Sequence, residues 1–547
     1  MMKNIIKNYT VILIVSLLWV GCATKKETII FDKNNGGLYL PEGFGAVVVI
    51  DSIGPSRHLA IKENGDIYVK LKITSDAPGS VALRDEDGDG KADIIQPFGS
   101  YVNDGIFATG MRIYNGYLYY TTEKVVYRQK LDNQLVPTSK QEIVLMDESE
   151  QWHIAKPLAF DNEGNMYVPY SAPSNACASF INTTGTSIQQ AGQYPCPELI
   201  NHAGIWKFKA NTINQTQKDG TQVGKGLRSI VAMAWNKQTN SLFAVQHGRD
   251  DLHLLWPQYY SAWENAVTPA EEFFEVRENN NYGWPYSYYD LITKQKLQAP
   301  EYGGDGKKLA TDKTYTHPLT VFPAHWAPND LLFYTGNQFP NRYKNGAFIA
   351  FHGSTNRGPY PQAGYIIAFV PFKNGNPSGE WEVFADGFAG IDTIVNVSDA
   401  KFRPMGIAEG PDGSLYINDS KKGKIWRIIY KEDKNKFNLG ALAKMERRKN
   451  TVSNIKTPDP LKDIIKIKYS KMGEQIYKTH CSNCHQNNLK GDNNRYPSLF
   501  KSNYLNDKSS FRHLIANGKG IMPAFKNISD KEIDELETYI QSLINNK

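Results

Sequence analysis

The chain has 547 residues, with 62 Lys and Arg against 56 Asp and Glu and a formal net charge of +6. It is too long for one hydrophobic core, so we expect two or more domains. The charge is spread along the chain, and the basic run 446–449 lies in a stretch rich in Lys and Asn. This distribution argues against a nucleic-acid-binding protein.

The N-terminus has the features of an export signal. Two lysines precede an apolar stretch over residues 11–20, which ends in Gly21-Cys22 and is too short for a comfortable membrane span. The pattern resembles a bacterial lipoprotein signal, although Trp19 stands where leucine is usual. The resemblance implies a signal over residues 1–22, a lipid on Cys22, and attachment of the mature protein to a membrane. An uncleaved signal anchor is the alternative, and both interpretations place the protein in the periplasm or at the cell surface.

Residues 38–430 show little helical periodicity and instead repeat one phrase. The phrase is a short apolar strand, a turn with Gly, and a strand of alternating aromatic and β-branched residues. Its second strands are Ile67–Val69, Tyr117–Tyr119, Met166–Val168, Leu242–Ala244, Ala347–Ile349 and Leu415–Ile417. Six such hairpins with unequal spacers predict an all-β, six-bladed β-propeller rather than a pair of β-sandwiches. The long spacer 248–289 is expected to form loops on the face that carries the site.

A loop early in this region carries alternating carboxylates. Asp85, Asp87 and Asp89 alternate with Glu and Gly, and oxygen ligands at this spacing suit Ca²⁺. The loop lacks the bidentate Glu and flanking helices of an EF-hand. A solvated turn is therefore the competing interpretation.

Residues 431–468 are rich in Lys and Asn and have few aromatic residues. This composition is typical of a linker, and we expect a tether with local helix only around residues 439–445.

The run Cys481–His485 reads Cys-Ser-Asn-Cys-His, the attachment signature of c-type haem. The two thiols add to the porphyrin vinyl groups, and the imidazole of His485 binds the iron. Zinc or dithiol redox chemistry is the alternative, but no second cysteine pair occurs in this C-terminal region. Met522 is the only later methionine and lies on a loop bounded by Gly and Pro, so we expect it as the sixth ligand, with His513 as the alternative.

The terminal segment has the pattern of an amphipathic helix that begins at a capping box made by Ser529 and Glu532. The order of haem motif, loop, Met-Pro and terminal helix resembles a small class I cytochrome c. The resemblance covers residues 469–547 and implies a small all-α domain.

The five cysteines can all be assigned. Lipid on Cys22 and haem on Cys481 and Cys484 leave Cys177 and Cys196, which in an oxidising compartment are the natural disulfide pair. Two buried unpaired cysteines are the alternative.

Several local phrases in the large region are shared with one enzyme family. They are Arg57–Ala60, Gly226–Arg228, Asn281–Pro285, Phe333–Pro340, His352–Arg357 and Arg403–Gly406, together with His325 and Ala327–Pro328. In this order they resemble the quinoprotein sugar dehydrogenases, the soluble glucose, L-sorbosone and pyranose dehydrogenases that use pyrroloquinoline quinone (PQQ). The resemblance covers nearly all of residues 38–430.

The resemblance implies where the PQQ cofactor binds. PQQ carries three carboxylates, and guanidinium groups suit carboxylates and quinone oxygens. The cationic candidates are Arg57, Arg228, Arg357 and Arg403, with His247 near the cofactor. The family holds an activating Ca²⁺ partly on backbone carbonyls, which correspond here to Gly248 and Arg249.

The resemblance also implies a catalytic base. His153 matches the histidine that takes the hydroxyl proton while hydride leaves toward the quinone, and an unperturbed imidazole is largely neutral at pH 7. This chain has Ser229, Thr355 and Lys156 where the family usually has Asn, Trp and Arg. These departures bear on the substrate more than on the cofactor.

Together these features predict an exported quinohaemoprotein that oxidises an aldose or related sugar with PQQ and passes electrons through its haem. The external acceptor would be a soluble cytochrome or a membrane redox component. In the alternative, the propeller is a carbohydrate- or protein-binding module or a lactonase, and the cytochrome serves a separate redox partner.

Overall fold

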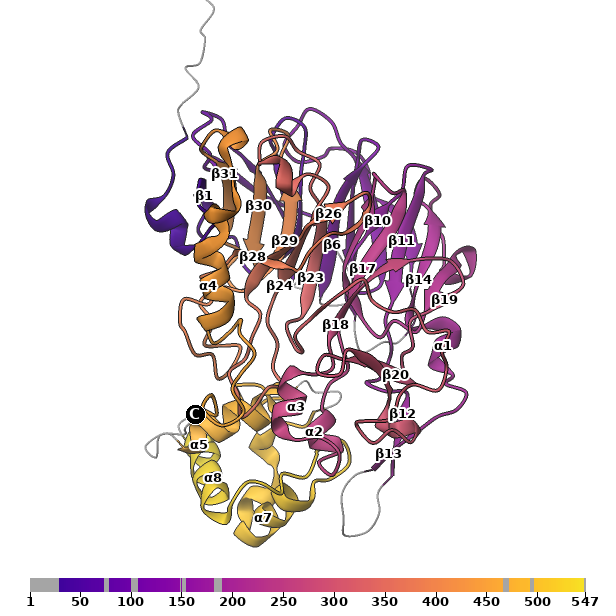
Figure 1. Cartoon of the computed structure of the whole chain (residues 1–547), viewed down its shortest axis with the longest axis vertical. Coiled ribbons are helices and arrows are strands. Elements are labelled where there is room, and N and C mark those ends of the chain that lie inside the picture. Colours follow the sequence, from indigo (N-terminus) through magenta and orange to yellow (C-terminus); the bar gives the residue numbers. More distant parts are fainter. Residues whose placement is uncertain are drawn as a thin grey trace, which may run out of the picture.

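The computed structural model describes residues 29–72, 78–99, 107–147, 149, 154–181, 189–465, 472–491 and 496–545. Its larger part is a ring of six antiparallel sheets arranged as blades (Figure 1), which confirms the predicted six-bladed β-propeller. A smaller helical part lies against one face of the ring. Among the described residues, no helix combines the length and apolarity needed to cross a bilayer.

The blades follow one another in chain order, and each starts with its innermost strand. The first contains β2 (Ser56–Ile61), β3 (Ile67–Leu71), β4 (Ser80–Arg84) and β5 (Ile94–Phe98). The second contains β6 (Ala108–Tyr114), β7 (Tyr117–Thr122), β8 (Val125–Lys130) and β9 (Glu142–Met146). The third contains β10 (Ala159–Phe160), β11 (Asn165–Tyr170), β14 (Gly204–Lys209) and β15 (Thr221–Lys225), with β19 (Asn280–Asn281) added in parallel.

The other three blades complete the ring. The fourth contains β16 (Ile230–Asn236), β17 (Ser241–Gln246), β18 (Glu271–Val276) and β22 (Thr320–Phe322). The fifth contains β23 (Pro328–Phe333), β24 (Ala347–Phe351), β25 (Ile366–Val370) and β28 (Glu382–Ala385). The sixth contains β29 (Pro404–Glu409), β30 (Leu415–Asp419) and β31 (Ile425–Tyr430), and its outer strand is β1 (Phe44–Ile50) from the start of the domain. Pairing of β1 with β31 joins the start and the end of the domain in one blade. This pairing closes the ring.

Connections between strands carry the remaining elements of the propeller. Three hairpins pair β12 (Ala178–Ile181) with β13 (Gln189–Gly192), β20 (Ser287–Asp290) with β21 (Gln295–Gln298), and β26 (Phe372–Lys373) with β27 (Asn376–Pro377). The short helices are α1 (Glu198–Asn201), α2 (Leu252–Leu255) and α3 (Ala262–Val267). The 3₁₀ turns are η1 (Lys33–Gly37), η2 (Gln217–Asp219), η3 (Pro300–Tyr302) and η4 (Asn341–Tyr343). The hairpin β20–β21, α2 and α3 lie on the same face as the helical part (Figure 1).

The C-terminal part is a helical domain with its own core. It contains α5 (Met472–Ile476), a π-helical turn η8 (Tyr477–Cys481), α6 (Ser482–His485), η9 (Leu499–Lys501), η10 (Asn503–Asn506), α7 (Lys508–Asn517) and α8 (Asp530–Asn545). Helices α5 and α8 cross so closely that a Cβ on Gly473 would lie 1.9 Å from the carbonyl oxygen of Glu535. Ser529 and Glu532 form the predicted capping box, with the Ser529 amide donating to Glu532 Oε2 at 2.8 Å.

The segment between the two domains is not the tether that its composition predicts. It contains η5 (Lys434–Lys436), η6 (Leu439–Leu442) and the helix α4 (Ala443–Thr451), which runs along the outside of the fifth blade (Figure 1). Met445 and Ile455 are 1% and 2% exposed and belong to the same apolar cluster as the fifth blade. The tether prediction is therefore wrong for α4 and the residues after it, because Met445, Val452 and Ile455 bury one face against the propeller; the predicted local helix around residues 439–445 is present.

Candidate functional site

Three cationic side chains lie at the end of the propeller where the innermost strands β2 and β29 begin. Arg57 lies on β2, Lys72 follows β3, and Arg403 immediately precedes β29. Burial and then the charge of Arg403 lower the pKa of Arg57 to about 10. Lys72 is an exposed residue, yet burial of its ammonium group and then Arg57 and Arg403 lower its pKa to about 8. An anionic ligand would stabilise these mutually repelling positive charges.

His352 completes this group, which we call the cationic cluster (Arg57, Lys72, His352 and Arg403). Burial and then Arg403, Arg57 and Lys72 hold the pKa of His352 well below its usual range, so this imidazole is neutral at pH 7. Arg403 donates to the carbonyl oxygens of His352 and Gly353, which fixes its guanidinium. The resemblance had brought Arg57 and Arg403 together, but it gave no role to Lys72 or His352, which lie far apart in the sequence.

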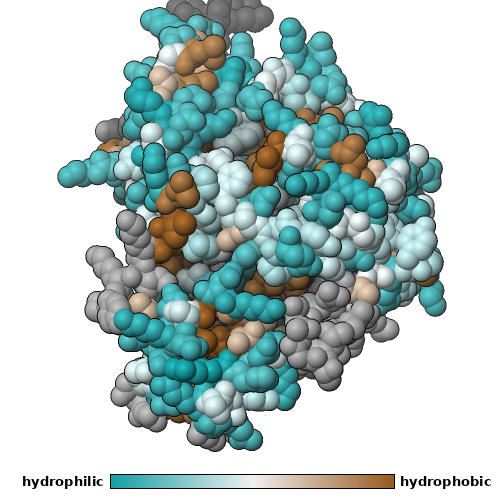
Figure 2. Space-filling view, turned by 60° about the horizontal axis from the view of Figure 1, so that its bottom comes forward, coloured by the Kyte–Doolittle hydropathy of each residue, from teal (hydrophilic) through white to brown (hydrophobic). Residues whose placement is uncertain are grey.

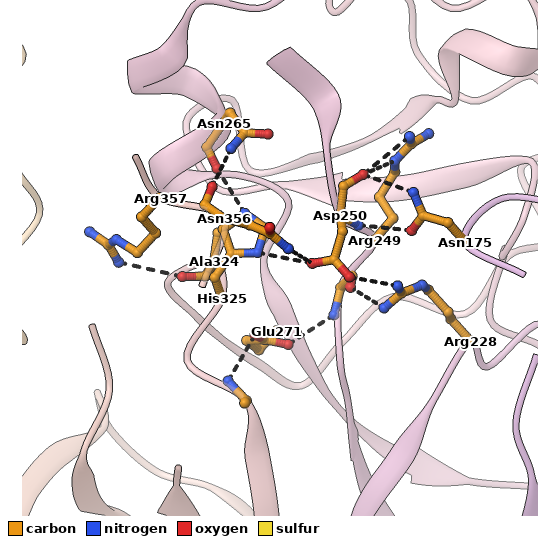
Figure 3. A network of polar contacts seen from close by, with 12 residues as sticks. Asn175, Arg228, Arg249, Asp250, Asn265, Glu271, Ala324, His325, Asn356 and Arg357 are labelled. Atoms are coloured by element: carbon orange, nitrogen blue, oxygen red, sulfur yellow. Dashed lines mark hydrogen bonds and ion pairs between the residues drawn. The ribbon is translucent and has the colours of Figure 1, made fainter. Parts of the chain in front are cut away.

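Arg228 is related to this group only through His247, on which its charge acts, and it has a different environment. Its guanidinium donates to Asp250 Oδ2 at 2.8 Å and to the carbonyl oxygen of Gly248 at 2.6 Å (Figure 3). Asp250 also accepts from Asn356 Nδ2 at 2.7 Å and lies 3.3 Å from His325 Nδ1. Burial alone would raise the pKa of Asp250, but Arg228, His325 and Asn356 together hold it far below its usual range.

Two further acids near Asp250 have raised pKa values. Burial and then the charge of Asp250 raise the pKa of Asp251 to about 6. Glu271, on β18, is 2% exposed and accepts from the amides of Gly248 (2.8 Å) and Ala327 (3.2 Å). Burial nevertheless raises its pKa to about 7. Sequence reasoning missed these acids; for Asp251 the available signal was the polar run His247–Asp251 directly after the buried strand β17.

The backbone carbonyls predicted to hold Ca²⁺ lie in this network. The Gly248 carbonyl oxygen and Asp250 Oδ2 are oxygen donors of the kind that Ca²⁺ takes, but both accept hydrogen bonds from Arg228. The side chain of Arg249 forms a buried ion pair with Glu301. A calcium ion at these oxygens would therefore compete with Arg228, and the calcium site stays a prediction.

His247 and Arg357 are the other two predicted cofactor-binding residues. Burial lowers the pKa of His247 to about 4, and its Nε2 is 2.8 Å from the carbonyl oxygen of Pro328. Arg357 is 1% exposed, and its Nε has no hydrogen-bond partner within the part of the chain that the structure describes. Burial lowers its pKa to about 10. Arg357 Nη1 donates to the carbonyl oxygen of Ala324 at 3.4 Å, and the Tyr365 hydroxyl acts electrostatically on the guanidinium. Arg357 is therefore not a member of the cationic cluster.

The haem-ligand candidates meet inside the helical domain. Cys481 and Cys484 are not joined in a disulfide, and Cys481 belongs to the same apolar cluster as the partly buried Met522. His485 is 8% exposed, and its Nδ1 lies 2.9 Å from the carbonyl oxygen of Pro497. That contact leaves Nε2 as the ring nitrogen for a metal, as is usual for a metal-binding histidine.

The remaining predicted positions have different outcomes. Cys177 and Cys196 form a disulfide with an S–S distance of 2.01 Å. Carboxylate oxygens of Asp85, Asp87 and Asp89 lie within 4.8 Å of one another on an exposed loop, and Ca²⁺ binding there stays a prediction. His153 and Cys22 lie outside the described residues.

Comparison with known proteins identifies both domains. Residues 38–431 match the family described as TrAA12-like. The chain belongs to this family. Residues 470–540 match the family described as cytochrome c oxidase, cbb3-type, subunit III, which makes the helical domain a cytochrome c domain.

Individual relatives of the TrAA12-like protein are distant. An uncharacterized protein of Borreliella burgdorferi is 28% identical over 223 residues, which is 40% of this chain and only 52% of that protein. A pyrroloquinoline quinone-dependent sugar dehydrogenase of Hypocrea jecorina is 21% identical over 440 residues, 75% of this chain and 86% of that protein. The calcium structure of the Trichoderma reesei carbohydrate-active enzyme of family AA12 covers 74% of this chain and 99% of its own, with a TM-score of 0.57 and 18% identity. At that identity the structural likeness shows the fold alone.

The donor sets of this TrAA12-like chain fit the two organic cofactors that its domains imply. In the propeller, the Nε of Arg57 is buried without a partner among the described residues, inside a cluster whose positive charges lower one another's pKa. A ligand with several carboxylates would supply the missing acceptors and counter-charge. In the cytochrome domain, Cys481 and Met522 share one apolar core, and Cys484 and His485 follow Cys481 in the haem-attachment motif, a donor set that fits haem c.

Proposed function

We propose that this protein is an exported quinohaemoprotein dehydrogenase that oxidises an aldose or a related sugar hydroxyl and delivers the electrons to an external one-electron acceptor. The observation that carries the proposal is the cationic cluster with its unpartnered Arg57 Nε, in a propeller that shares its chain with a cytochrome c domain. Bound PQQ would supply the hydride-accepting quinone.

The residues of the chain would divide the remaining tasks. Arg57, Lys72 and Arg403 would bind the cofactor carboxylates and hold its ring plane, because their positive charges act on one another and carboxylates would offset that repulsion. His352, neutral at pH 7, adds a hydrogen-bonding group without adding charge. Arg228 would be held ready by Asp250 and Gly248 at the edge of the same site.

The proton of the sugar hydroxyl needs a base within hydrogen-bond reach. We assign this role to His153, on the strength of its match to the family's catalytic position. Its removal would leave cofactor binding intact and stop sugar oxidation. We also propose that the protein is lipid-anchored through Cys22 and faces the periplasm or the outside of the cell, on the strength of the N-terminal pattern and of haem c and disulfide chemistry, which both belong outside the cytoplasm.

The test is reconstitution of the purified holocytochrome with PQQ and Ca²⁺, followed by addition of aldoses under anaerobic conditions. We expect reduction of the haem, seen in its absorbance spectrum, with at least one aldose. His153→Ala should abolish the reduction while the exposed His317→Ala leaves it unchanged. Arg403→Met should weaken PQQ binding in equilibrium dialysis, whereas the exposed Lys401→Met should not. Absence of haem reduction with every aldose, together with undiminished PQQ binding in Arg403→Met, would overturn the proposal.

A further inference from the structure

The segment that joins the two domains is fastened to the propeller along its length. Arg448 Nε donates to Asp386 Oδ2 at 2.7 Å, and the Lys449 ammonium lies 3.8 Å from the centre of the Trp381 ring. Together with buried Met445, these contacts fix α4 against the fifth blade. Apolar burial, an ion pair and a cation–π contact in one short helix are more than a flexible linker would make.

The fastening continues beyond α4 toward the cytochrome domain. Asn454 is 2% exposed and exchanges two hydrogen bonds with Gly364, at 2.8 and 2.9 Å. Three later hydrogen bonds join the segment to the propeller. Trp263 Nε1 donates to the carbonyl oxygen of Pro458 at 2.8 Å, and Tyr360 Oη donates to that of Pro460 at 2.9 Å. The amide of Ile465 donates to the carbonyl oxygen of Pro359 at 2.9 Å. We call residues 443–465 the strap. It is anchored as far as Ile465, and α5 begins at Met472.

The cytochrome domain then contacts the propeller through its haem-attachment turn. Asn396 is 2% exposed and donates from Nδ2 to the Lys478 carbonyl oxygen at 2.7 Å and to Ser482 Oγ at 2.9 Å. Its other amide atom, Oδ1, accepts from Ser398, which fixes the direction in which Nδ2 points. Lys478 and Ser482 flank Cys481, so one propeller side chain holds both sides of a haem-attachment cysteine.

A second contact between the propeller and the haem-attachment turn requires glycine at position 358. A Cβ on Gly358 would lie 2.5 Å from Thr479 Cγ2 and 4.0 Å from Thr479 Cβ. The backbone of Gly358 does not have the positive φ that would itself demand glycine. Close approach of the cytochrome domain is therefore what excludes a side chain here.

Few side chains separate this contact from the cationic cluster. The Arg403 guanidinium lies 5.9 Å from the centre of the Tyr365 ring, and the charges of both Arg403 and Arg357 act on the Tyr365 hydroxyl. Arg357 directly precedes Gly358. Figure 1 shows the helical domain lying against one face of the ring, and Figure 2 shows that the surface on this side is mainly hydrophilic, with small separate apolar areas.

We propose that the strap and Asn396 hold the haem-attachment turn in one fixed position over the cofactor end of the propeller, with Asn396 as a positioning residue. Electron transfer between the domains would then be a first-order step that needs no domain movement. That the electrons come from a sugar oxidised in the propeller rests on the proposed function, whereas the fixed docking of the cytochrome domain does not.

The electron balance defines what the docked domain must do. Oxidation of one sugar hydroxyl releases two electrons and two protons, while the haem iron takes one electron, from ferric to ferrous. The second electron can enter only after an external one-electron acceptor, such as ferricyanide in the assay, has reoxidised the iron. A fixed interface serves both transfers in succession without redocking.

The test of the docking uses the purified holocytochrome without any substrate. Amide hydrogen exchange is measured for residues 477–485 in the wild type, in Asn396→Ala combined with Gly358→Ala, and in the control Gly379→Leu. Gly379 is exposed, and a Cβ there meets only Pro371 at an ordinary 3.4 Å. We expect exchange about tenfold faster in the double variant and unchanged in the control, because release of the interface exposes the turn.

A rescue variant separates the interface from general damage. Thr479→Ala removes the Cγ2 atom that would meet the new methyl group of Gly358→Ala, so protection in Gly358→Ala should return when Thr479→Ala is added. Unfolding of the propeller, followed by tryptophan fluorescence, should be the same in all these variants. Equal exchange in wild type and the double variant, or failure of the rescue, would overturn the docking proposal.

Haem reduction supplies the second readout. In stopped-flow mixing of reconstituted wild type with aldose, the intramolecular phase should be independent of protein concentration and unchanged when glycerol doubles the viscosity. A rate that falls about twofold in that experiment would show a swinging domain and overturn the fixed position. If no aldose reduces the haem at all, the proposed function fails, while the exchange experiment still decides whether the domain is docked.

Discussion

Asp250 offers a quantitative test of how the propeller site is stabilised. Its carboxylate lies between Arg228, at 2.8 Å, and His325, at 3.3 Å, and also accepts from Asn356 at 2.7 Å. Asp250→Asn keeps the shape of the side chain and the hydrogen bond from Asn356, but it removes the negative charge of the carboxylate. Arg228, which is 2% exposed, is then left without its counter-ion.

The size of the effect follows from burial. Breaking a fully buried ion pair by removing one partner costs about 3–5 kcal/mol. Asp250 is 24% exposed, so solvent screens part of the interaction and we expect a loss of about 2–3 kcal/mol in the free energy of unfolding. The pKa of Asp250 is lowered, so this stabilisation is fully present above the ordinary carboxyl pKa. It would be lost only as pH falls through the lowered value.

Urea unfolding of the full chain at pH 7 measures the loss, with tryptophan fluorescence for the propeller and Soret absorbance for the cytochrome. Only the fluorescence transition should shift. Arg228→Met added to Asp250→Asn should recover most of the loss, because no unpaired charge then remains. A loss below about 0.5 kcal/mol, or no recovery in the double variant, would refute the electrostatic reasoning.

Three other predictions concern separate parts of the chain. Replacing Cys177 and Cys196 by Ala should cost about 3 kcal/mol of propeller stability in urea unfolding, because the bond closes a loop with a sequence separation of 19. Met522→Ala should lower the haem reduction potential and let added imidazole change the haem spectrum, since the sulfur ligand that raises the potential is gone. Glu271 has its pKa raised from 4.5 to about 7, so the folded state keeps a proton that the unfolded state releases, and stability should fall as pH rises across that window. Glu271→Gln should flatten this slope in unfolding measurements at pH 5 and pH 7.5; an unchanged slope would contradict the assignment.

The propeller was predictable because its strands are encoded locally. The six recurring phrases lie on β3, β7, β11, β17, β24 and β30, which are the second strands of six different blades. An alternating pattern bounded by a Gly turn reports the local hairpin directly. The haem motif was equally readable, because its ligating cysteines and histidine are adjacent in the chain.

The cationic cluster and the strap were only partly predictable, because they depend on contacts between distant segments. Lys72 lies in an ordinary polar stretch, and Asn396 meets Ser482 across a separation of 86 residues. The first half of the strap did carry a weak signal in Met445, Val452 and Ile455, apolar residues among mainly polar ones, all of which pack on the fifth blade. Composition averaged over the segment concealed that spacing.

A fixed cytochrome domain limits how an acceptor can reach the haem. Part of the attachment side is covered, since Ser482 is 7% exposed and accepts a hydrogen bond from Asn396 of the propeller. Beside Met522, by contrast, Ile521 is 44% exposed. On our proposal electrons therefore enter from the side of the attachment turn, and an acceptor must approach from the Met522 side. Entry and exit would then use different surfaces of one small domain, which allows an acceptor to bind without displacing the propeller.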